Sequence, residues 1–150
     1  MRHALRRGVC VIPMRMDGDV LRILLQFRCK RAWIYPSCWA FFGGGVESGE
    51  HPSTALKREG LEEFGFLIRG HEPFRVSWHL KPGGVRVLDH TYLLNWQWDR
   101  LTICLSEGED HDWFTIDDAL ALKSLPPHER SDLLFLQEKK PEVTGMALAA

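Results

Sequence analysis

Near the middle of this chain, a loop rich in glycine runs directly into a segment rich in glutamate. Three of the glutamates, Glu59, Glu62 and Glu63, are spaced three and four residues apart, so on an α-helix they share one face. Like charges at these spacings repel by roughly 0.2–0.5 kcal/mol per pair. A hard divalent cation held by oxygen ligands offsets this repulsion. The pattern therefore favours a helix that carries a metal site.

The same stretch carries signals for both ends of that helix. Pro52 fits the first helical position, where its missing N–H costs nothing, and Gly65 fits the left-handed residue that ends a helix. We therefore predict a helix from Pro52 to Phe64. The glycines at 43–45 and 49 precede it and let the backbone approach a ligand closely. This combination indicates a site for a metal ion and a phosphate.

The stretch resembles the Nudix box, G-x5-E-x7-R-E-U-x-E-E-x-G-U, in which U is a bulky aliphatic residue. Seven residues match in register over twenty-three positions: Gly44, Glu50, Arg58, Glu59, Glu62, Glu63 and Gly65. The sequence departs from the pattern at Gly60, where the family has an aliphatic residue, and at Phe66, which is aromatic. Just upstream, Phe41-Phe42 replaces the usual proline before the glycines.

The resemblance implies an α/β fold of the Nudix type, an α/β/α sandwich with a mixed sheet between helices. A chain of 150 residues is one domain by length. We expect residues 1–141 to form a single Nudix hydrolase domain and residues 142–150 to form a loose C-terminal tail. The order of the predicted elements agrees with this fold: strands at 8–14, 21–27, 39–42, 74–80, 85–98 and 113–115, and late helices from 117 and over 127–139.

Gly60 is unusual inside a helix because glycine costs about 1 kcal/mol there relative to alanine. It also leaves a gap where the family places a packed side chain. We expect a large neighbour, Phe42 or Phe64, to fill that gap. The alternative is a catalytic helix that is less rigid than in other members of the family.

The resemblance also implies which residues bind metal and which catalyse. Mg²⁺ or Mn²⁺ would bind the metal ligands Glu59, Glu62 and Glu63, with Glu50 as a further candidate. Glu62, Glu63 and Arg58 would be catalytic, and Arg58 would pair with Glu50 and hold the loop against the helix. For the three helix glutamates, the alternative is an ordinary solvated face.

A general base must reach the attacking water, and Nudix enzymes take it from the helix or from a later loop. The acidic loop before Trp113 supplies two candidates, Glu109 as the first choice and Glu107 as the second. The alternative is that both are merely solvated loop acids.

The segment from Arg28 to Cys38 mixes cations with aromatic residues and has little periodicity. Such a loop can hold phosphates and stack a nucleobase. The predicted substrate-binding residues are Arg28, Trp33, Tyr35, Gly44 and Gly45. The alternative is that the cations are solvated and the aromatic rings only cap the core.

Composition limits the other classes of partner. A net charge of −1 argues against binding of duplex nucleic acid through a broad basic face. The four cysteines have no disulfide or zinc spacing, and no apolar run is long enough for a membrane span. We expect reduced thiols in a cytoplasmic protein, and the oligomeric state stays open, a homodimer included. The seven histidines show no close metal-ligand pair, so we expect most of them in surface or turn positions.

The sequence therefore predicts a metal-dependent Nudix pyrophosphohydrolase. Its small-molecule substrate would be a nucleoside triphosphate, or a nucleoside diphosphate linked to another moiety. One alternative is a catalytically silent Nudix-like domain that binds or senses a nucleotide. A second is a structural domain whose acidic helix contacts a basic partner.

Overall fold

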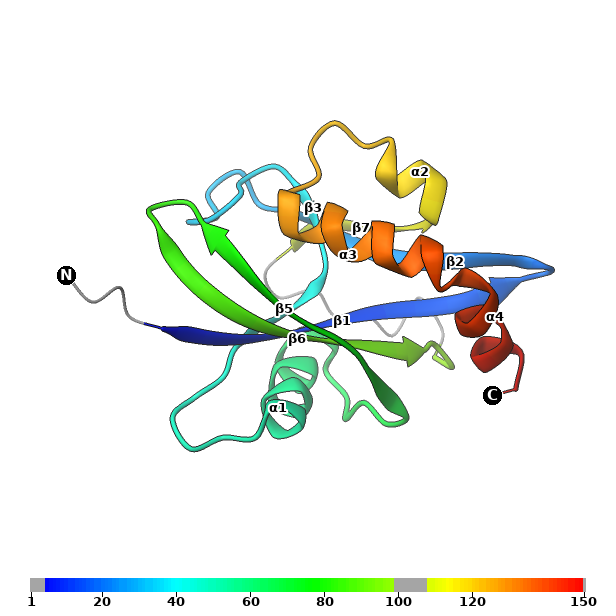
Figure 1. Cartoon of the computed structure of the whole chain (residues 1–150), viewed down its shortest axis with the longest axis horizontal. Coiled ribbons are helices and arrows are strands. Elements are labelled where there is room, and N and C mark those ends of the chain that lie inside the picture. Colours follow the sequence, from blue (N-terminus) through cyan, green and yellow to red (C-terminus); the bar gives the residue numbers. More distant parts are fainter. Residues whose placement is uncertain (1–4, 99–107, 150) are drawn as a thin grey trace.

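The computed structural model describes residues 5–98 and 108–149 (Figure 1). The strands are β1 (Arg6–Asp17), β2 (Val20–Arg28), β3 (Trp39–Ala40), β4 (Phe42–Gly45), β5 (His71–Lys81), β6 (Val85–Asn95) and β7 (Gly108–Thr115). The helices are α1 (Pro52–Phe64), α2 (Ile116–Leu120), α3 (Pro127–Glu138) and α4 (Lys140–Ala149).

The strands form one mixed sheet. Its order is β3-β2-β1-β6-β5, and β4 pairs with β1 while β7 pairs with β2. The pairing of β1 with β6 is parallel and the other pairings are antiparallel. Two hairpins join strands that are adjacent in the chain, β1 with β2 and β5 with β6. The register of the second hairpin shifts between Pro73 and Arg75 of β5.

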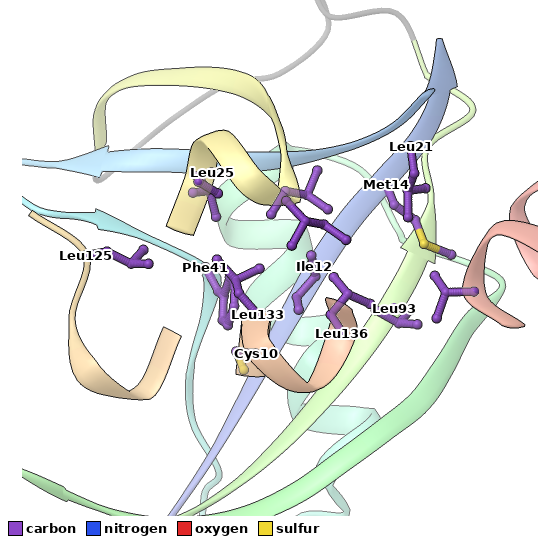
Figure 2. Close-up of a cluster of buried hydrophobic side chains, with 14 residues drawn as sticks. Cys10, Ile12, Met14, Leu21, Leu25, Phe41, Leu93, Leu125, Leu133 and Leu136 are labelled. Carbon is purple, nitrogen blue, oxygen red and sulfur yellow. The ribbon is translucent and has the colours of Figure 1, made fainter. Parts of the chain in front are cut away.

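The central strand β1 is buried on both faces, which explains its continuous apolar sequence. Cys10 and Ile12 point into a core shared with α2, α3 and α4, which Figure 2 shows in close-up. Val9 and Val11 point into a second core, covered by α1. In Figure 1, α1 lies on one side of the sheet and α2 and α3 lie on the other. The predicted α/β/α sandwich is confirmed.

The C-terminal segment is helical, so the prediction of a loose tail from residue 142 is wrong. Pro141 does follow the end of α3, but it lies in the first turn of α4, where a proline is tolerated. Val143 then anchors the new helix, because its side chain is only 3% exposed in the core beside α3. None of the helices in the described ranges is both long and apolar enough to span a membrane.

Candidate active site

Helix α1 has the predicted bounds. His51 caps its N-terminus, with the ring accepting a hydrogen bond from the Ser53 N–H (3.1 Å). Gly65 ends it in the left-handed region, at φ 77°, and its N–H bonds to the Leu61 carbonyl (3.0 Å). Ala55 and Leu56 are buried in the core that the helix covers, a turn or two before Glu59 and Glu63 on the same side of the helix. Packing therefore fixes the rotation of the helix and with it the direction of its carboxylates.

The gap at Gly60 is filled by Ile68, from the segment after the helix. A Cβ placed on Gly60 would lie 3.2–3.3 Å from three side-chain carbons of Ile68, which is fully buried. The prediction of Phe42 or Phe64 as the filling residue is wrong; those two rings pack against each other, with centroids 4.8 Å apart. Residues 66–68 form no strand, and Ile68 in this segment supplies the contact.

The three predicted metal ligands differ in their surroundings. Glu63 is buried at 5% exposure, and its Oε1 accepts a hydrogen bond from the Gly43 N–H (3.4 Å). Glu59 lies against the glycine loop, because any side chain at Gly44 would collide with its carboxyl group. The Glu62 side chain is 57% exposed. The three carboxylates of α1 thus differ in exposure, and those of Glu59 and Glu63 lie against the glycine loop.

Arg58 links the helix to the loop before it, as predicted. Its Nε donates to Oε2 of Glu50 (3.0 Å), and its Nη2 donates to Oε1 of Glu50 and to the Gly45 carbonyl (both 2.9 Å). Its Nη1 donates to Glu59 (2.9 Å). The Arg58 guanidinium, helped by the Glu47 N–H, lowers the pKa of Glu50 to about 2. Glu50 is therefore ionised at any physiological pH.

The donor set of α1 fits a hard divalent cation. Carboxylate oxygens are the ligands that Mg²⁺ and Mn²⁺ prefer. Gly44 supports this fit, since only a residue without a side chain leaves room for the Glu59 carboxylate at this place. Both oxygens of Glu50 already accept hydrogen bonds from Arg58, and Oε1 also accepts one from the Glu47 N–H. Glu50 is thus the least suited of the four predicted ligands.

A cavity of about 530 Å³ adjoins the glycine loop, and its lining includes Gly43, Gly44 and Gly45 but no residue of α1. All five predicted substrate-binding residues line it: Arg28, Trp33, Tyr35, Gly44 and Gly45. Two further arginines of β1, Arg6 and Arg7, also line it and are exposed. Gly44 therefore separates the cavity from the Glu59 carboxylate.

The loop between β2 and β3 shapes the outer wall of this cavity. Arg28 ends β2, and its Nε donates to the Ile34 carbonyl (3.0 Å), which holds the loop. Tyr35 has φ 49°, in the left-handed region that a non-glycine residue rarely adopts. Trp33 is 96% exposed, so this ring does not cap the core.

The predicted general bases cannot be placed. Glu107 lies outside the described residues, and Glu109 falls in β7 but its side chain is not among those described. Among the described cysteines, Cys10, Cys29 and Cys38 are free thiols.

Four residues that sequence reasoning did not single out also line the cavity: His79, Asp89, His128 and Glu129. We call these four the buried end. The Nε2 atoms of His79 and His128 each lie 3.2 Å from Oδ2 of Asp89, and a side chain at Gly8 would collide with the Asp89 carboxylate. The expectation of surface histidines is wrong for this pair. One signal was present: an aspartate in the apolar run of β6.

Burial sets the charges at the buried end. It lowers the pKa of His79 and of His128 to about 4, so both rings are neutral at pH 7. It also raises the pKa of Asp89 to about 6 and that of Glu129 to about 7. Desolvation is the largest cause in all four cases.

His79, Asp89 and His128 also offer three possible metal-ligand atoms within 4.8 Å of one another. However, the two imidazole rings stack, with centroids 4.0 Å apart and planes inclined by 20°. A nitrogen lone pair lies in the plane of its ring, so two nearly parallel stacked rings do not converge on one ion. In a second such set, Cys10, His128 and Asp132, the Asp132 carboxylate already accepts hydrogen bonds from Thr91 and Arg75.

The NUDIX domain family model matches residues 4–136. The nucleoside triphosphatase NudI of Escherichia coli O139:H28 (strain E24377A / ETEC) is 39% identical over 61 residues, which cover 41% of this chain and 42% of that protein. The NudI of Salmonella paratyphi B (strain ATCC BAA-1250 / SPB7) is 29% identical over 130 residues, 81% of this chain and 90% of that protein.

Two solved structures share the fold. The MutT protein from Methanosarcina mazei Go1 has a TM-score of 0.77 at 17% identity and covers 93% of this chain and 98% of its own. The MutT NUDIX hydrolase from Burkholderia pseudomallei has a TM-score of 0.71 at 28% identity, with 87% and 96% covered. The chain therefore belongs to the Nudix family.

Proposed function

We propose that this protein is a divalent-metal-dependent pyrophosphohydrolase whose substrates are nucleoside triphosphates. The observation that carries the proposal is the carboxylate face of α1, placed beneath the glycine loop that lines the cavity. Among the alternatives that the sequence left open, a triphosphate is supported by the similarity to the NudI nucleoside triphosphatases. A diphosphate linked to another moiety has no comparable support.

In this proposal, Glu59, Glu62 and Glu63 hold the cation, Mg²⁺ or Mn²⁺. When bound, the ion supplies positive charge to the phosphate oxygens and makes water more acidic. The Gly43 N–H fixes one oxygen of Glu63, so this carboxylate is already oriented before a cation arrives. We assign Glu50 an orienting role through Arg58 in place of a ligand role, because Arg58 occupies both of its oxygens.

Arg58 acts as a positioning residue. Its guanidinium bonds to Glu59 on the helix and to Glu50 and the Gly45 carbonyl on the loop, so it fixes the spacing between the two. Groups that orient metal ligands in this way typically change metal affinity by about 10–100-fold when they are removed.

The cavity is the proposed site for the nucleoside. Arg6, Arg7 and Arg28 give its rim a positive charge suited to phosphate oxygens, and we call these three the basic rim. Trp33 also lines the cavity and is almost fully exposed, so its ring has room to stack on a base. For the general base we keep Glu109 as the first candidate and Glu107 as the second. Their Glu→Gln variants test this directly.

The decisive experiment measures product release from a panel of nucleoside triphosphates with Mg²⁺ or Mn²⁺. We expect Glu62→Gln and Glu63→Gln to lower turnover by at least about 100-fold while circular dichroism shows an intact fold. Glu72→Gln on β5 is the matched control, because this glutamate is exposed and lies on another element. Undiminished turnover in both α1 variants would contradict the metal assignment.

The same panel separates the alternatives. A domain that only binds nucleotide would release no product from any substrate, yet nucleotide would raise its melting temperature. A structural domain with an acidic helix would show no saturable change in thermal stability with either metal ion. The arrangement of Arg58, Glu50 and Glu59 argues against both, because neither role needs oriented carboxylates.

A further inference from the structure

The cavity has two chemically different ends. The basic rim of Arg6, Arg7 and Arg28 is exposed or half-buried, and Arg7 also donates to the Glu50 carbonyl (3.3 Å) next to α1. The buried end instead carries two carboxyl groups and two neutral imidazoles. A ligand that fits both ends is anionic at one end and rich in N–H donors at the other.

The buried end contains polar atoms that no protein group satisfies. Nδ1 of His79 is buried and has no hydrogen-bond partner, while Nε2 of the same ring faces Oδ2 of Asp89 at 3.2 Å. Glu129 forms no ion pair with any residue in the described ranges. Buried polar groups are nearly always hydrogen-bonded in native proteins, so exceptions that face a cavity point to a ligand.

The charges around the two carboxyl groups show which ligand groups are suitable. Lys81 of β5 is the cation that acts on both Asp89 and Glu129. A third acid, Asp132 of α3, already forms an ion pair with Arg75 (3.0 Å), so we do not count it among the acceptors for a ligand. Lys81 thus acts on two carboxyl groups that lie beside the unsatisfied Nδ1 of His79. The buried end therefore has more acceptor than donor capacity at neutral pH.

We propose that the buried end binds the base of the substrate through the N–H groups of that base, so that bases with an exocyclic amino group are preferred. Guanine, cytosine and adenine carry such a group, whereas uracil, thymine and hypoxanthine do not. Glu129 and Asp89 accept the hydrogen bonds, and His79 lies beside them. This inference rests on the proposed triphosphate hydrolysis and names the substrates that the same site selects.

Matched substrate pairs test the inference without any mutation. The triphosphates dGTP and dITP differ only in the 2-amino group, and dCTP and dUTP differ at position 4 of the ring. We expect kcat/KM to favour the amino-bearing member of each pair by roughly ten- to a hundredfold, because hydrogen bonds to charged groups are the stronger ones. A ratio near one, or a preference for dITP and dUTP, would overturn the inference.

Variants then assign the preference to residues. Glu129→Gln and Asp89→Asn should each bring the two ratios toward one, whereas Glu138→Gln, an exposed glutamate on the same helix, should leave them unchanged. Ratios that persist in both variants would overturn the inference. A general loss of stability would lower all rates together and leave the ratios intact. If a variant does not fold, the wild-type pairs alone decide.

The result also separates the two proposals. If no triphosphate is hydrolysed with Mg²⁺ or Mn²⁺, the proposed function itself fails. If all members of the panel are hydrolysed with similar kcat/KM, the proposed function stands and the inference about the buried end fails.

Discussion

Gly60→Ala tests whether Ile68 really completes the packing of α1. Alanine favours a helix over glycine by about 1 kcal/mol, which would stabilise the protein. Against this, the new Cβ would lie 3.2–3.3 Å from three carbons of Ile68, a side chain with no exposed surface into which it could move. Overpacking of this kind costs about 1–3 kcal/mol. We therefore expect a net loss of about 1 kcal/mol in the free energy of unfolding.

The effect of Gly60→Ala on the free energy of unfolding should change sign when the Ile68 side chain is removed. Ile68→Ala alone should cost about 2–5 kcal/mol, as for other buried aliphatic truncations. In that background the clash is absent, so Gly60→Ala should stabilise the protein by about 1 kcal/mol. Urea unfolding followed by circular dichroism gives all four free energies of the cycle. If Gly60→Ala has the same effect in both backgrounds, Ile68 does not fill the gap.

Four further outcomes are expected. Arg58→Lys should raise the Mg²⁺ concentration for half-maximal activity by about 10–100-fold, because lysine cannot replace the forked contacts to Glu50; a magnesium titration of activity checks this. Gly44→Ala should weaken the binding of Mg²⁺ in the same titration, since the new Cβ would displace the Glu59 carboxyl group. Trp33→Ala should change the free energy of unfolding by less than about 0.5 kcal/mol while raising KM for triphosphates, which denaturation and steady-state kinetics separate.

The fourth expected outcome concerns Glu129, whose pKa rises from 4.5 in the unfolded chain to about 7 in the native protein. Between these values the native state holds a proton that the unfolded state releases, so this group lowers stability as pH rises. Relative to wild type, Glu129→Gln should therefore gain about 1.4 kcal/mol in the free energy of unfolding per pH unit over that window, measured by urea unfolding at several pH values.

The sequence was sufficient for the parts of the site that depend on local spacing. The bounds of α1 follow from Pro52 and Gly65, and the contact of Arg58 with Glu50 follows from the motif. These features involve residues within about one loop and one helix, so their geometry is set by the helical repeat.

Features that depend on distant segments were missed. Ile68 occupies the space beside Gly60 because the chain returns to the helix after Gly65. Nothing in the local sequence pattern distinguishes Ile68 from Phe42 for this role. The buried end brings together His79 of β5, Asp89 of β6 and residues of α3, which meet only once the sheet order is known. The C-terminal helix was missed because its stability comes from packing and not from its own polar pattern.

Gly8 of β1 has a consequence for how this protein could diverge. Any side chain at this position would push into Asp89, on the face of the sheet opposite α1. A single substitution there could change which nucleotides are accepted and leave the hydrolytic helix untouched. Selectivity and bond cleavage reside on separate layers of the fold, so evolution or protein engineering could alter one without rebuilding the other.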